Sequence, residues 1–401
     1  MVGGRAGRYA RTVFSRRFGR TGIDVSVFSC GGMRYQQSWS RTATVTPASQ
    51  LNVDATVARA FELGINHVET ARGYGTSEDQ LGKTLARHPR DRFVLQTKLR
   101  PAEDPKAFAA QLEESFGRLG VSVIDLLAIH GVNDAAALET TLRPGGCLEV
   151  AESFRRAGRI RALGFSTHAP TSVIVRAIQS NRFDYVNLHY YYIFQDNLPA
   201  LVAARDHDLG VFIISPSDKG GRLHRAPERL RALVAPLSPM VFNDLWCLAH
   251  PTIHTLSIGA ARPSDFDEHV GALAQLDEAR SLLPPIVARL ESAYRDAVGD
   301  DFSCRWQQGL REWTELPGKV NVKRILWLRN LVHAFDLLDF AQERYASMSP
   351  DDSWVPGARA TGFDDAEMIA ALPDSPYRDR IPRLLHEAHE LLSNPAVKAL
   401  P

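Results

Sequence analysis

Cysteine is scarce in this 401-residue chain, which contains only four. They are widely separated, at Cys30, Cys147, Cys247 and Cys304. No pair has the spacing of a CxxC-type metal or redox motif, and the count does not require a disulfide. We therefore expect free thiols in a reducing cytoplasm and no metal site.

The chain also lacks an excess of either charge and lacks long apolar runs. With 47 basic and 46 acidic residues the net charge is +1, so no overall field favours nucleic acid or an anionic membrane. No apolar run reaches the roughly 18 residues that span a bilayer. The arginine-rich start is followed by the turn Gly19-Arg20-Thr21-Gly22 instead of the apolar segment of a signal peptide. These absences predict a cytoplasmic protein that begins with a basic flexible tail over residues 1–14.

A glycine-rich dinucleotide fingerprint is absent after the first apolar run, where Val27–Met33 has no GxGxxG spacing. Short apolar runs nevertheless alternate with amphipathic helical stretches. Eight candidate strands begin near Val25, Ile65, Arg92, Val123, Ile160, Tyr185, Gly210 and Ile253. This count predicts an α/β fold, a (β/α)8 TIM barrel, over residues 15–280. An N-terminal β-hairpin around Thr21-Gly22 could plug its bottom.

The remainder of the sequence, residues 281–401, has no strand alternation. Its helical runs, at 281–298, 323–343 and 379–392, are separated by stretches with Pro and Gly. We expect a C-terminal helical extension that is structural or covers the barrel mouth.

Four residues with proton chemistry follow three successive candidate strands. Glu69 lies at the end of the second strand and Tyr74 in the loop after it, Lys98 ends the third and His130 ends the fourth. The carboxyl ends of parallel strands meet at one end of a barrel, so these side chains should converge. An ammonium beside a tyrosine should lower the pKa of the phenol, and a carboxylate should orient that ammonium. Such a group can donate a proton to a developing alkoxide, but hydride must come from a cofactor.

These stretches resemble the aldo-keto reductases, whose site is an Asp–Tyr–Lys–His tetrad on this barrel. The resemblance rests on GINHVETARGYGTSEDQLGKTL, FVLQTKL and IDLLAIHG, with matching spacing. It implies that Tyr74 is the proton donor, that Lys98 modulates its pKa and that His130 orients the substrate. Glu69 stands where the family has Asp. The implied activity interconverts a small-molecule carbonyl and an alcohol with NADP(H), favoured over NAD(H).

The resemblance also implies a set of cofactor-binding residues. These are Ser166, Thr167, Asn187, Ser215, Ser257, Gly259, Arg262 and Glu268. Two positions depart from the family: Ile214 stands where an aromatic ring often stacks on the nicotinamide, and Asp265 where a basic residue commonly meets the 2′-phosphate. A carboxylate at that position would favour NAD, whereas Arg262 favours NADP.

The C-terminal part resembles the extension of a subgroup of bacterial aldo-keto reductases, some of which hold an iron–sulfur cluster there. Only Cys304 lies in this part of the chain, and a [4Fe–4S] cluster takes four thiolates, so no cluster is expected. Two alternative functions stay open: a nicotinamide-binding regulatory subunit without activity, and a biosynthetic enzyme that performs non-redox chemistry. The run Tyr190-Tyr191-Tyr192 either lines an apolar pocket or packs at a strand end. Neither the substrate nor the oligomeric state follows from the sequence.

Overall fold

The computed structural model describes residues 13–393, which form two compact units. The first unit contains the residues up to Gly220 together with Met240–Arg280, and the second contains Gly221–Pro239 and the residues from Ser281 onward. The basic tail expected over residues 1–14 lies almost wholly outside the described residues. The segment Gly221–Pro239 thus groups with the C-terminal helices, although it lies inside the span expected for the barrel.

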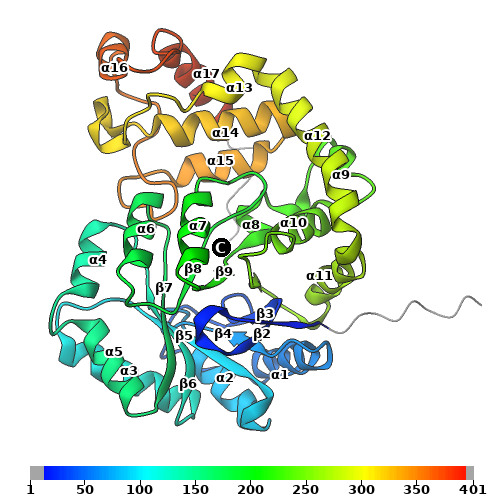
Figure 1. The fold of residues 1–401 in the computed structure, drawn as a ribbon, viewed down its shortest axis with the longest axis vertical. Coiled ribbons are helices and arrows are strands. Elements are labelled where there is room, and N and C mark those ends of the chain that lie inside the picture. The colour runs from blue at the N-terminus through cyan, green and yellow to red at the C-terminus, as the bar shows by residue number, and fades with distance from the viewer. Residues whose placement is uncertain (1–12, 394–401) are drawn as a thin grey trace, which may run out of the picture. The chain divides into compact units, whose positions relative to one another are not determined.

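The first unit is a closed barrel of eight parallel strands, as predicted (Figure 1). Its strands are β3 (Phe28–Gly31), β4 (His67–Glu69), β5 (Val94–Leu99), β6 (Ile124–His130), β7 (Ile160–Ser166), β8 (Tyr185–Leu188), β9 (Gly210–Ile213) and β10 (Thr255–Ile258). The ring closes where β10 pairs with β3, and registers such as Gly31↔Glu69 and His130↔Ser166 align the strand ends. The side chains that end β4 to β7 therefore share one end of the barrel.

Helices connect these strands. They are α1 (Pro47–Glu62), α2 (Ser77–Leu85), α3 (Pro105–Leu119), α4 (Ala135–Leu142), α5 (Cys147–Arg156), α6 (Thr171–Gln179), α7 (Leu198–Asp206), α8 (Pro216–Lys219), α10 (Pro239–Leu248) and α11 (Asp267–Ala272). Helix α3 has an Asp104 cap whose side chain accepts from the Lys106 N–H, and it ends at the left-handed Gly120. These local signals explain why its bounds follow directly from the sequence.

The N-terminal hairpin closes the bottom of the barrel, the end at which the strands begin. Its strands are β1 (Ser15–Arg17) and β2 (Asp24–Ser26). Val25 belongs to this hairpin, so the predicted start of the first barrel strand was wrong. That strand begins at Phe28, because one apolar run, Val25–Cys30, supplies both β2 and β3.

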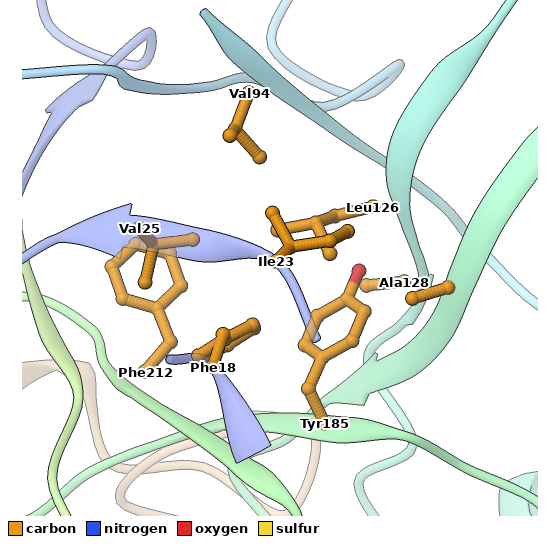
Figure 2. Close-up of a cluster of buried hydrophobic side chains, with 9 residues drawn as sticks. Phe18, Ile23, Val25, Val94, Leu126, Ala128, Tyr185 and Phe212 are labelled. Atoms are coloured by element: carbon orange, nitrogen blue, oxygen red, sulfur yellow. The ribbon is translucent and has the colours of Figure 1, made fainter. Parts of the chain in front are cut away.

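Phe18, at the turn of the hairpin, is fully buried and enters a cluster of apolar side chains (Figure 2). The other members are Ile23, Val25, Val94, Leu126, Ala128, Ala162, Tyr185 and Phe212. A Cβ at Gly210 would lie 2.7 Å from the Phe18 ring, so the absence of a side chain at Gly210 makes room for it. The prediction of a hairpin plug is confirmed.

The second unit is helical. It contains α9 (Glu228–Val234), most of α12 (Ala279–Val298), α13 (Asp300–Arg305), α14 (Val322–Phe335), α15 (Leu338–Ser347), α16 (Asp365–Ala371) and α17 (Ile381–Ser393). The helix expected over 323–343 is broken at Asp336, which takes the left-handed conformation with φ 61°. Arg229 Nε donates to the Ala334 carbonyl at 2.7 Å, and Arg289 Nε donates to the Leu233 carbonyl at 3.0 Å. These bonds attach the segment Gly221–Pro239 to the C-terminal helices.

The cysteines are free: Cys30, Cys147 and Cys247 are buried and Cys304 is exposed. Within residues 13–393 no group of three or more His, Cys, Asp or Glu side chains could hold a metal ion. None of the helices in this described range combines the length and hydropathy of a membrane span.

Candidate active site

Glu69 and Lys98 form a buried ion pair at the end of the barrel where the strands finish. The side chain of Lys98 is 2% exposed and that of Glu69 is 5% exposed. The Lys98 ammonium bonds to Glu69 Oε2 and donates to the Thr70 carbonyl at 2.9 Å. The other carboxylate oxygen, Oε1, accepts from Ser257 Oγ at 3.2 Å. Glu69 therefore retains the pairing expected of the shorter Asp and gains a contact with β10.

Space for the longer carboxylate comes partly from Gly31. A Cβ at Gly31 would lie 3.0 Å from Glu69 Oε1 and 2.9 Å from the Ile258 carbonyl. A side chain at this position would therefore press directly on the Glu69–Lys98 pair.

Tyr74 lies beside the ammonium of this pair. Its hydroxyl is 3.4 Å from Lys98 Nζ, and the same ammonium is 4.8 Å from the centre of the Tyr74 ring. Burial raises the pKa of Tyr74, and Lys98 opposes that rise without reversing it. Lys98 acts on the pKa of Tyr74 in the expected direction, but desolvation is the larger effect and the net pKa is raised. Tyr74 is thus a neutral phenol near pH 7, with its hydroxyl next to a cation.

Lys98 remains charged in this setting. Burial alone would lower its pKa, but Glu69 and Tyr74 outweigh that effect, so the pKa of Lys98 is raised. The site therefore contains a fixed ammonium at the point where a phenolate would form. Such an ammonium stabilises the anion that remains after Tyr74 gives up its proton.

His130 ends β6 and faces Tyr74. Their ring centroids are 5.8 Å apart at an interplanar angle of 87°. Burial, together with the charges of Lys98 and Arg100, lowers the pKa of His130 to about 3. His130 is therefore neutral near pH 7 and carries one N–H for hydrogen bonding. All four residues predicted from the strand ends are brought together.

A loop from another part of the chain approaches Tyr74 closely. Gly75 has φ +52°, and a Cβ there would lie 1.8 Å from the Ser38 carbonyl oxygen. Trp39, which is 62% exposed, meets the Tyr74 ring edge-on at 6.5 Å between centroids. Trp39 was not predicted from the sequence, in which the glycines around Tyr74 are the only signal of this close approach.

Three of the expected nicotinamide residues lie on adjacent strands at the same end of the barrel. Ser166 and Asn187 are register partners on β7 and β8, and Thr167 directly follows β7. Thr167 Oγ1 donates to the Val132 carbonyl at 2.6 Å, so the hydroxyl hydrogen of Thr167 is bonded within the protein. Asn187 is fully buried, yet neither its amide oxygen nor its amide nitrogen has a hydrogen-bond partner among the described residues. An unpaired buried amide is costly, so Asn187 fits a ligand that both donates and accepts hydrogen bonds.

The remaining expected residues lie near the ends of β9 and β10. Ser215 takes a left-handed conformation, φ 54°, just before α8. Ser257, near the end of β10, donates its hydroxyl hydrogen to Glu69 Oε1 and so lies beside the Glu69–Lys98 pair. Gly259 adjoins the Arg34 side chain, since a Cβ there would lie 3.4 Å from it.

Arg262 and Glu268 are both exposed. Arg262 Nε pairs with Asp265 Oδ1 at 3.0 Å, and Asp265 Oδ2 accepts from the Ala261 N–H at 2.9 Å. Asp265 thus neutralises part of the charge that Arg262 would offer to a phosphate. His269, the residue after Glu268, is buried, and its Nδ1 lies 2.6 Å from Asp244 Oδ2. This nitrogen is therefore hydrogen-bonded within the protein.

Comparison with known proteins identifies the family of this chain. The model of the aldo/keto reductase family matches residues 28–231, just over half of the chain. The chain belongs to the aldo/keto reductase family. It is therefore an oxidoreductase for carbonyl or alcohol groups in a family that uses a nicotinamide cofactor, and the resemblance inferred from the sequence is confirmed.

Individual relatives of this reductase are distant. An L-galactose dehydrogenase of Arabidopsis thaliana is 23% identical over 300 residues, which are 65% of this chain and 88% of the relative. An aldo-keto reductase of a Mycobacterium species, strain JLS, is 37% identical over 123 residues, 30% of this chain and 42% of the relative. The holo form of an aldo-keto reductase from Bacillus halodurans has a TM-score of 0.55 and 20% identity, over 67% of this chain and 96% of that one. This last likeness concerns the fold.

Proposed function

We propose that this reductase interconverts a small-molecule aldehyde or ketone and the corresponding alcohol with NAD(P)H, and that Tyr74 donates the proton during reduction. The observation that carries the proposal is the buried Lys98 ammonium, fixed by Glu69 and the Thr70 carbonyl, 3.4 Å from the Tyr74 hydroxyl. When bound, the nicotinamide supplies the hydride.

The protein's own part in the reaction follows from four groups. Neutral His130 donates its N–H to the carbonyl oxygen and orients it. Tyr74 passes its hydroxyl proton to that oxygen as negative charge develops there. Lys98 stabilises the remaining phenolate, and Glu69 keeps the ammonium in position. In alcohol oxidation the same groups act in reverse.

The residues at the barrel end fit a nicotinamide cofactor. The unpaired amide of Asn187 has both a donor and an acceptor for the carboxamide, and Ser166 lies beside it on β7. We propose NADP(H) as the preferred form because the guanidinium groups of Arg34 and Arg262 adjoin the segment 259–262. Asp265 works against this preference, so Asp265→Asn should tighten NADPH binding relative to NADH, as measured by titration of nicotinamide fluorescence.

Turnover tests the proposed function directly. Purified full-length protein is mixed with NADPH or NADH and a panel of carbonyl compounds, and cofactor oxidation is followed by absorbance. The panel includes aldoses, because two relatives are named L-galactose dehydrogenase and D-threo-aldose 1-dehydrogenase. We expect saturable turnover with at least one member, in either direction. Cofactor binding without any turnover would contradict the proposal and favour a regulatory role.

A further inference from the structure

Two histidines with no role in the scheme above lie at the same end of the barrel. His168 follows Ser166 by two residues, and His189 follows Asn187 by two residues. His168 Nδ1 lies 2.5 Å from His189 Nε2, and the two rings stack with centroids 4.7 Å apart. A contact this short requires one nitrogen to donate and the other to accept.

The direction of that bond is set by a neighbouring carbonyl group. The Ile214 carbonyl can only accept, and it takes the single hydrogen of the Tyr191 hydroxyl. The Tyr191 oxygen must then accept from His189 Nδ1, which is 2.5 Å away. His189 is 1% exposed, and a neutral imidazole has a single N–H, so with Nδ1 as the donor its Nε2 is the acceptor. His168 Nδ1 is consequently the donor to His189.

This chain of hydrogen bonds leaves His168 Nε2 with a lone pair. Lys219 Nζ is 3.5 Å from His168 Nδ1, at the limit for a hydrogen bond, so it does not compete with the 2.5 Å contact. Burial and the charge of Lys219, with a smaller effect of His130, hold the pKa of His168 well below its ordinary value, so the ring stays neutral.

The lone pair of Nε2 has no hydrogen-bond partner among residues 13–393. The side chain of His168 is partly exposed, although Thr167 and Ala169 on either side are buried. His168 also follows the strand that pairs with the His130 end of β6. The reductase thus presents a fixed, uncharged hydrogen-bond acceptor near its proposed catalytic groups.

We infer that His168 determines substrate specificity, and that its Nε2 accepts a hydrogen bond from a substrate hydroxyl near the reacting carbon. The substrate class is then hydroxylated carbonyl compounds, or the polyols and lactols related to them by oxidation and reduction, in preference to plain aldehydes and ketones. This inference rests on the proposed function.

The first test compares two substrates of equal chain length, glyceraldehyde and propanal, in the wild type and three variants. In His168→Leu, kcat/KM for glyceraldehyde should fall about 10-fold, the effect of one lost hydrogen bond, while propanal changes less than about two-fold. His168→Gln retains an acceptor and should recover part of the loss. His189→Leu removes the acceptor that holds the proton on His168 Nδ1, so His168 can also carry it on Nε2. This variant should give an intermediate loss of kcat/KM for glyceraldehyde. Equal losses for both substrates, or no loss for either, would overturn the inference.

The second test does not depend on turnover. Nitrogen-15 NMR of histidine-labelled protein reports which ring nitrogen carries the proton, with the His168 signals assigned by comparison with His168→Gln. We expect protonation at Nδ1 of His168 and of His189, and an altered His168 signal in Tyr191→Phe. A proton on Nε2 of His168 overturns the inference even if carbonyl turnover is present. An absence of all turnover contradicts the proposed function instead.

Discussion

The two ends of the barrel are built from the same eight strands and have opposite chemistry. At the bottom, Phe18 and its neighbours form an apolar cluster without an ion pair among its members (Figure 2). At the other end, the Glu69–Lys98 pair is almost completely buried beside Tyr74. Apolar burial contributes to stability, whereas a buried ion pair usually contributes little net stability.

This contrast indicates which end carries which task. The apolar cluster at the bottom stabilises the fold, and the carboxyl ends of the strands carry the groups proposed to act in catalysis. The unpaired amide of Asn187 strengthens this view, because a fold selected for stability alone would pair it or replace it. Substitutions at the two ends should therefore separate stability from activity.

The largest effect is expected from Lys98→Met. Without the ammonium, the phenolate of Tyr74 loses its stabilisation, and kcat should fall about 10²–10⁴-fold. Glu69 would be left as an unpaired buried carboxylate, which costs about 3–5 kcal/mol of folding stability. The double variant Lys98→Met/Glu69→Gln is the control: it should regain stability and remain inactive. Steady-state kinetics and urea unfolding measure both quantities, and recovery of activity in the double variant would contradict the role of Lys98.

The next largest effect is expected from Phe18→Ala at the opposite end. Removing a fully buried ring should lower the free energy of unfolding by about 3–5 kcal/mol, while kcat of the folded enzyme stays within two-fold, roughly. Phe14→Ala is the matched control, since Phe14 is 37% exposed in the same segment and should change stability little. A fall in kcat as large as that of Lys98→Met would show that the two ends are not separable.

A third effect concerns His67 and His254, whose rings contact Phe18 of the plug. Burial lowers the pKa of His67 and of His254 to about 4. The unfolded chain binds protons to these residues below pH 6.5 or so, and the folded chain does so only below about pH 4. Stability should therefore be complete above about pH 6.5 and fall as the pH decreases toward 4, by up to ~1.4 kcal/mol per pH unit for each histidine.

Urea unfolding between pH 7 and pH 4.5 measures this slope. His67→Gln should make it shallower, because one titrating group is lost while an amide can still bond with Gln96, the partner of His67 at 2.9 Å. Phe14→Ala, which removes no titratable group, serves as the control and should leave the slope unchanged. An unchanged slope in His67→Gln would contradict the burial of a neutral imidazole at the start of β4.

The smallest effect is expected from Glu69→Asp. The shorter side chain can hold either Lys98 or Ser257 at the present distances but not both, so kcat should fall about 10-fold, a loss of ~1.4 kcal/mol. Ser257→Ala removes only the 3.2 Å contact with Glu69 Oε1 and should lose less. Faster turnover in Glu69→Asp than in the wild type would show that the longer carboxylate is not matched to this site.

Much of the barrel could be predicted from local signals. Helix α3 begins after Asp104 and ends at Gly120, and both are recognisable caps. The start of the first barrel strand could not be predicted, because Val25–Cys30 is a single apolar run divided between a hairpin and the barrel by tertiary pairing. The break of the C-terminal helix at Asp336 was missed because the left-handed position at a helix end, usually Gly, is here an Asp.

The part of the candidate site that lies at the strand ends could be predicted from the sequence. Glu69, Tyr74, Lys98 and His130 converge because parallel strands align their carboxyl ends. The pKa of Tyr74 was not predictable, since desolvation depends on burial that only the folded chain provides. The hydrogen bonds from His168 to Tyr191 were also hidden, because they join the segments after β7 and β8 and follow no sequence spacing. Tyr191 itself is buried and donates to the Ile214 carbonyl within this network.

The central claim, that Tyr74 is the proton donor, is tested most directly by turnover of Tyr74→Phe. This variant keeps the ring against His130 and Trp39 and removes only the hydroxyl beside Lys98. We predict that nicotinamide binding, measured by fluorescence titration, stays unchanged while kcat for carbonyl reduction falls at least about 10²-fold. Full turnover in Tyr74→Phe with unchanged cofactor binding would contradict the account.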